Sequence, residues 1–203
     1  MFQLHPVLRP RERLIPTRAI PAQATGRMIL ADVNYGRNMD GIDRGEIKKL
    51  LVLETLPKPI NFTGGMEPLS YGGTFTLERV LGTVPVEEDG SAYFEVPAMR
   101  SLFFVALDKN DIALKRMQSF VTVQPGEVSS CAGCHEQRTR APQYLGSVSL
   151  KATSKEPVRI EPVADVPQVL DFPRDIQPVL DRHCVKCHDD DKRDGGIVLS
   201  GDR

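Results

Sequence analysis

The sequence predicts a mainly β protein, a sandwich-like domain that is followed by a short, partial α-helical segment. Between positions 26 and 150, apolar or alternating segments recur about every 10 residues with turn residues between them, which is typical of a sandwich. No long amphipathic helical pattern stands out in that range. The pattern changes after position 171, where apolar residues take helical spacing and lead to a cysteine motif.

The first predicted strands differ in how clearly the sequence marks them. Residues 27–33 and 75–86 are rich in apolar and β-branched residues, as strands require. The range 45–54 is ambiguous, because its apolar residues fit one helical face while the run LLVL fits a buried strand. A glycine-rich stretch between 61 and 73 indicates a loop.

Three further strands are predicted in the second half of the β region. Ala92, Phe94 and Val96 alternate with more polar neighbours, which indicates a half-buried strand. The continuous apolar run over 101–108 indicates a fully buried strand, and 113–123 is predicted as the next one. Turn residues precede the first of these segments at 88–90, separate the last two at 109–111 and end the last at 125–126.

Composition divides the chain into four regions. Residues 1–24 carry four prolines and four arginines and are predicted to be extended, and 25–150 form the β domain. Residues 151–171 contain three prolines among charged and small residues, which is the composition of a linker. Residues 172–203 are the last and shorter region, in which 175–184 are predicted to form a short helix.

The overall charge does not favour nucleic acid or an anionic membrane as partner. The net charge of the 203 residues is −1, which gives no electrostatic reason to expect nucleic acid or an anionic membrane as partner. The longest strongly apolar run is 102–107, far short of a membrane span, and no apolar signal-peptide core is visible near the N-terminus.

The four cysteines carry the chemical information. They fall in two C-x-x-C-H motifs, Cys131-Ala132-Gly133-Cys134-His135 and Cys184-Val185-Lys186-Cys187-His188, and none is left over. This pattern marks attachment of a c-type haem. On a helical turn, two thiols at this spacing lie on one side and can form thioethers with the haem vinyl groups, while the histidine ligates the iron. We therefore predict two covalent haem c groups, with His135 and His188 as iron ligands.

Three other interpretations of the cysteines compete with haem attachment. A four-cysteine zinc site normally places its two pairs about 15–20 residues apart, and it leaves both histidines without a role. A thioredoxin-like dithiol needs a βαβ pattern, which the sequence lacks. Structural disulfides are the third alternative. Haem c attachment explains more of the pattern than any of them and implies a periplasmic or otherwise exported location.

The segments DVNYGRNMDGIDRGEIKKLLVLE, GTVPVEEDGSAYFEVPAMRSLFFVALD and MQSFVTVQPGEVSSCAGCHEQR resemble the hydrazine synthase alpha-subunit middle domain, over residues 26 to 142. This family is abundant in exported multidomain proteins of planctomycete-type bacteria. The tail FPRDIQPVLDRHCVKCHDDDKRDGGIVLSGD resembles the opening of a planctomycete-type cytochrome c domain, which implies that 172–203 is a truncated cytochrome c-like segment. The resemblance implies that Cys131, Cys134 and His135 hold one haem, and that Cys184, Cys187 and His188 hold the other.

These patterns leave three functions open. The chain could be an electron-transfer module of a larger exported multihaem protein, working with a redox partner protein or with adjacent domains of a longer chain. It could instead be a fragment of a haem enzyme subunit similar to hydrazine synthase alpha, or a structural interaction domain. Tyr35, Tyr144 and Met117 are candidate axial groups at the first haem. Met117 also fits a place in the core.

Overall fold

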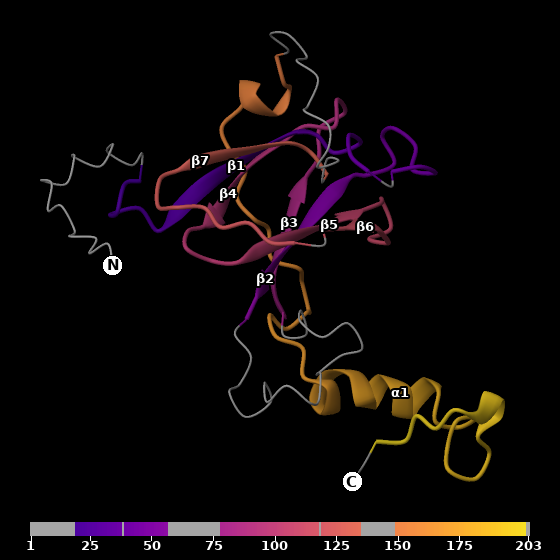
Figure 1. The fold of residues 1–203 in the computed structure, drawn as a ribbon. Coiled ribbons are helices and arrows are strands. Elements are labelled where there is room, and N and C mark those ends of the chain that lie inside the picture. The colour runs from indigo at the N-terminus through magenta and orange to yellow at the C-terminus, as the bar shows by residue number, and fades with distance from the viewer. Residues whose placement is uncertain (1–18, 38, 57–77, 118, 135–148, 202–203) are drawn as a thin grey trace, which may run out of the picture.

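The structure is a computed structural model that describes residues 19–37, 39–56, 78–117, 119–134 and 149–201. Within these ranges, strands dominate the region up to the first cysteine motif (Figure 1). The strands are β1 (Thr25–Asp32), β2 (Lys49–Thr55), β3 (Glu78–Pro85), β4 (Ala92–Pro97), β5 (Leu102–Leu107), β6 (Ala113–Arg116) and β7 (Val128–Gly133).

The strands form two sheets. One has the order β4-β1-β7, in which β1 pairs antiparallel with β4 and parallel with β7. The other has the order β3-β2-β5-β6, and all of its neighbours are antiparallel. β3 and β4 are therefore edge strands of different sheets.

The two sheets share one hydrophobic core, which confirms the prediction of a mainly β protein and defines a sandwich. Alternate residues of β1 and β4 on one sheet, and of β2, β3 and β5 on the other, join the same buried cluster. Phe94 and Phe104 link the sheets directly, with ring centroids 5.7 Å apart in an edge-to-face arrangement. The buried strand residues of this cluster are Met28, Leu30, Leu50, Val52, Val84, Ala92, Phe94, Val96, Leu102 and Ala106.

Most predicted strands are confirmed, and the ambiguous range 45–54 contains β2. In β2, Leu50 and Val52 pack into the core while Leu53 joins a second buried cluster on the opposite face of the sheet, so the run LLVL is a strand buried on both faces. The prediction for 75–86 corresponds to β3, although residues 75–77 lie outside the described ranges.

Two strand predictions need correction. The strand predicted over 113–123 ends at Arg116, and beyond it Val121 forms only an isolated bridge with Leu102. The first cysteine motif lies on a further strand, β7, which the sequence pattern does not predict. β7 reads VSSCAG and has a weak apolar pattern, because it lies at the edge of its sheet and is largely held by its pairing with β1.

The range 151–171, which has the composition of a linker, runs along the edges of both sheets. Val158 pairs with β4 through two backbone hydrogen bonds, to Tyr93 O at 3.0 Å and from Glu95 N at 2.9 Å. Glu161 exchanges backbone hydrogen bonds of 2.8 and 2.9 Å with Thr83 of β3. We call residues 151–169 the strap, because they cover the exposed edges of β3 and β4.

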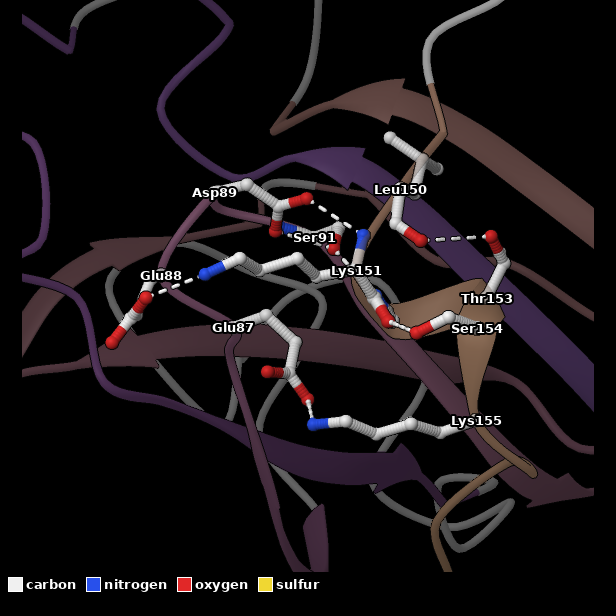
Figure 2. Close-up of polar contacts among 10 residues, drawn as sticks. Glu87, Glu88, Asp89, Ser91, Leu150, Lys151, Thr153, Ser154 and Lys155 are labelled. Carbon is white, nitrogen blue, oxygen red and sulfur yellow. Dashed lines mark hydrogen bonds and ion pairs between the residues drawn. The ribbon is translucent and has the colours of Figure 1, made fainter.

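The strap begins at the turn between β3 and β4, where ion pairs hold it (Figure 2). Lys151 donates to Glu88 at 2.5 Å through its ammonium group, and its backbone N donates to Asp89 at 2.8 Å. Lys155 donates to Glu87 at 2.7 Å. The hydrogen bond from Lys151 lowers the pKa of Glu88, and the carboxylate in turn raises the pKa of Lys151. These contacts are exposed, so they place the strap more than they stabilise it.

The chain after the strap forms a small helical segment. A π-helical turn, η3 (Phe172–Ile176), leads into α1 (Gln177–His183), and neither contains a buried residue. This confirms the helix predicted over 175–184, with a slightly later start. Figure 1 shows α1 beyond the lower ends of the sheets, away from the start of the strap. No helix among the described residues is long and apolar enough to cross a membrane.

Candidate functional site

The first cysteine motif lies on a strand rather than on a helical turn. Cys131 is opposite Leu30 in the parallel pairing of β7 with β1, and Gly133 is opposite Asp32. The expectation of a helical turn is therefore wrong for this motif. The reason is that β7 obtains its backbone hydrogen bonds from a strand about 100 residues earlier in the chain, which a short motif does not reveal.

A close approach of two backbone segments positions the end of this motif. The Cys134 N–H donates to the carbonyl oxygen of Tyr35 at 2.7 Å. A Cβ atom at Gly133 would lie 2.0 Å from the Tyr35 carbonyl oxygen, and one at Gly36 would lie 2.3 Å from the Cys134 carbonyl oxygen. Both positions therefore require glycine for steric reasons, so the loop that follows β1 fixes where the motif ends.

The two thiols of the first motif have different surroundings. Cys131 is partly buried and packs against the core cluster of the sandwich, as expected for a neighbour of Leu30 in the sheet. Cys134 follows the end of β7 at a bend and is half-buried. His135 and Tyr144 lie outside the described residues. Of the candidate axial groups, Tyr35 adjoins the motif through its backbone, whereas Met117 packs in the second hydrophobic cluster.

The second motif does form a helical turn, as its sequence predicts. The N–H of Cys184 donates to Leu180 O at 2.8 Å, and the N–H of His188 donates to Cys184 O at 3.1 Å. This i→i−4 bond brings the thiol-bearing residues and the imidazole onto one turn. Cys184 is half-buried and Cys187 is exposed. The His188 Nδ1 atom is buried without a hydrogen-bond partner.

The chain after the second motif returns to it. The N–H of Leu199 donates to His188 O at 2.8 Å, and the Leu199 carbonyl accepts from the Gln177 side chain at 2.9 Å. This return places Ile197 and Val198, both exposed, next to the turn that carries the motif. Exposed apolar side chains beside a C-x-x-C-H turn suit the face of a porphyrin.

The residues of the second motif fit a covalent haem. They supply two thiols for thioether bonds and an imidazole for the iron. The Nδ1 atom of His188 is buried and makes no hydrogen bond within the protein, so no internal contact explains this histidine. The first motif supplies the same donor types, but Cys131 faces the sandwich core. Because the motifs lie at opposite ends of the sandwich, the structure does not bring the four cysteines together as a tetrahedral zinc site needs.

Reciprocal caps define the start of the helical segment that presents the second motif. The Asp171 carboxylate accepts from Arg174 N at 3.0 Å, and the Asp175 carboxylate accepts from Asp171 N at 2.8 Å. The hydrogen bond from the Arg174 guanidinium, and then that from the Asp171 backbone, lower the pKa of Asp175 from 3.8 to about 2.

The lowered pKa of Asp175 predicts an acid-sensitive cap. A carboxyl whose pKa is depressed in the folded state stabilises that state above its unfolded pKa, and the effect is lost as the pH falls from about 3.8 through about 2. NMR chemical shifts of residues 177–183 should therefore report fraying of α1 between pH 4 and pH 2. The Asp175→Asn variant should fray already at pH 6 and change little on acidification. Shifts that are the same in both proteins from pH 6 to pH 2 would contradict this role of Asp175.

The fold and the motif together define a class: a two-sheet sandwich that carries a C-x-x-C-H motif at the end of an edge strand. The model of one protein family, the hydrazine synthase alpha subunit middle domain, matches residues 45–136. The matched range runs from just before β2 to just after the first motif. The second motif lies outside it, so its assignment to a cytochrome c domain stays a prediction.

A solved structure has the same fold. It is the hydrazine synthase of Kuenenia stuttgartiensis, which superposes with a TM-score of 0.68 at 19% sequence identity and covers 92% of this chain. The chain spans 32% of the length of that protein, about a third. At this identity the likeness establishes the fold and not the activity. No curated protein sequence matches the chain.

Sequence reasoning missed the loop that holds the first motif. Tyr35 was considered for its phenol group, whereas the structure uses its backbone carbonyl, and Gly36 was not singled out. The only signal was an isolated glycine in a polar stretch, which is compatible with any turn. The three-dimensional partner of that glycine, the Cys134 carbonyl, is not evident from the sequence.

Proposed function

We propose that the chain is the haem-carrying part of a subunit similar to hydrazine synthase alpha, with one c-type haem at each C-x-x-C-H motif. The observation that supports it best is that the family match ends at residue 136, so the matched domain contains the whole first motif. The superposition with a solved hydrazine synthase supports the same fold over most of the chain.

In this proposal, Cys131 and Cys134 hold the first haem with His135 as iron ligand. The helical turn of Cys184 and Cys187 holds the second, with His188 as iron ligand. A bound haem supplies a redox-active iron whose reactivity is set by its axial ligands and its surroundings. The chain itself attaches each porphyrin and orients the imidazole. Because both attachments are thioethers, the protein would mature in an exported compartment.

A second candidate function is electron transfer without catalysis of its own. The position of the second motif favours this function. The motif follows η3 and α1, which contain no buried residues, so a partner protein can approach this helical segment. The coordination of each iron distinguishes the two functions. An open axial position at the first haem favours an enzyme, whereas six-coordinate iron at both haems favours electron transfer to a redox partner or an adjacent domain.

Haem loading tests the proposal directly. Protein that is exported in a host with cytochrome c maturation machinery should retain the mass of two haems after denaturation. The paired variants Cys131→Ser/Cys134→Ser and Cys184→Ser/Cys187→Ser should each retain one, because each removes both thioethers of one site. Protein without haem, or with stoichiometric zinc in its place, would overturn the proposal.

A further inference from the structure

Hydrogen bonds hold the residues that follow the second motif against the turn that carries it. The N–H of Asp194 donates to Cys187 O at 3.1 Å, and the N–H of Leu199 donates to His188 O at 2.8 Å. The carbonyl oxygen of Leu199 also accepts from the Gln177 side chain of α1 at 2.9 Å. We call the stretch from Asp194 to Leu199 the return segment. Its path beside the motif is held at both of its ends.

Two apolar residues between these anchors are open to solvent. Ile197 is 52% exposed and Val198 is 37% exposed, although the backbone on either side of them is held. Single exposed apolar residues are common on protein surfaces and need no explanation. Two adjacent β-branched residues on an anchored segment, beside a motif that attaches a porphyrin, indicate instead that the bound group covers them.

The helical segment has no core of its own into which these side chains could turn. The structure describes every residue from Leu170 to Gly201, and none of them is buried. Folded units shorter than about 40 residues usually need a disulfide, a metal or a partner for stability. A porphyrin held covalently at Cys184 and Cys187 would give this segment a large apolar surface to pack against.

We infer that Ile197 and Val198 bind the porphyrin of the second motif, and that the return segment closes against it once Cys184 and Cys187 are attached. This inference rests on the proposed haem attachment at that motif and needs none at the first. The two side chains exclude water from one side of the macrocycle, while His188 presents its imidazole to the iron. Burial against the porphyrin in turn stabilises the return segment, because it removes apolar surface from water.

Hydrogen exchange tests the inference, because the amide of Leu199 reports whether the return segment is closed. Exported, haem-loaded protein is compared with the variant Cys184→Ser/Cys187→Ser by mass spectrometry of peptides from the return segment. Its amides should exchange about tenfold more slowly in the loaded protein. The double variant Ile197→Ser/Val198→Ser should abolish most of this protection in loaded protein. It should change nothing in the background without the two cysteines, where both side chains are already exposed.

Val179→Ser is the matched control. Val179 of α1 is 54% exposed, close to the 52% of Ile197, but it lies outside the return segment. Its substitution should leave exchange of the return segment unchanged. Equal exchange rates in the loaded double variant and the loaded parent would overturn the inference, and so would an acceleration of the same size with and without haem. Absence of a haem-bearing peptide at Cys184 and Cys187 in the parent would instead overturn the proposed function at this motif.

Discussion

A chain that ends at Leu150 is expected to unfold at a much lower denaturant concentration than the full chain. It would lose the strap, and with it five backbone hydrogen bonds between described residues of the strap and of β3 and β4. At about 1 kcal/mol each, these bonds contribute on the order of 5 kcal/mol, a large part of the 5–15 kcal/mol that stabilises a typical domain. The deletion also removes the buried side chain of Ala152.

The matched control is a chain that ends at Asp171. It keeps the strap and removes only the helical segment, so its urea midpoint should stay close to that of the full chain. Far-UV circular dichroism in urea can follow both proteins without any haem. A chain that ends at Leu150 and keeps the midpoint of the longer one would show that the strap does not stabilise the sandwich. The shorter chain should also aggregate more readily, because it exposes two strand edges.

The strap also explains why β3 contains glycine at position 82. A Cβ atom there would lie 2.1 Å from the Glu161 carbonyl oxygen, and the φ angle of 139° is itself unfavourable for other residues. Position 82 lies at an irregularity in the pairing of β2 with β3. The glycine and the irregular pairing therefore allow the strap backbone at Glu161 to pack closely against the edge of β3.

The sequence predicted the strands that bury a continuous or alternating apolar face. The core residue Phe94 of β4 belongs to an alternating pattern, and Leu102 of β5 belongs to a continuous apolar run. Both patterns predict strands. The strap was not predicted as structure, because only a few of its residues pair with the sheets, and prolines separate them. Composition alone therefore indicates a linker, although edge pairing requires only isolated backbone contacts.

The two cysteine motifs show the limit of a local pattern. The same five-residue spacing is a helical turn at His188 and an extended strand at Cys131. At the second motif, the preceding helix α1 sets the backbone, and the sequence predicted that helix. At the first, the backbone follows from pairing with β1, which depends on the whole arrangement of the sheet. The chemical identity of the residues is readable from the sequence at both motifs, whereas the backbone geometry of the first motif is not.

The substitution Gly133→Ala is expected to destabilise the protein by about 3 kcal/mol, at the upper end of the cost of overpacking a tight site. The new methyl group would lie 2.0 Å from the Tyr35 carbonyl oxygen and 2.9 Å from the Tyr35 Cβ. Neither atom is the far end of a flexible side chain, so β7 and the loop after β1 must separate. Their separation would weaken the 2.7 Å hydrogen bond from Cys134 to Tyr35.

Thermal unfolding should register this cost as a fall in Tm of roughly 10 °C for a protein of this size. Ser130→Ala is the control, since Ser130 is exposed in the same strand and its loss should change stability by less than about 0.5 kcal/mol. Gly36→Ala should resemble Gly133→Ala, because its methyl group meets the other side of the same contact. If Gly133→Ala melted like Ser130→Ala, the close approach that fixes the first motif would not exist in solution.

Haem attachment in Gly133→Ala should fall at Cys131 and Cys134 and stay complete at Cys184 and Cys187, because only the first motif depends on that contact.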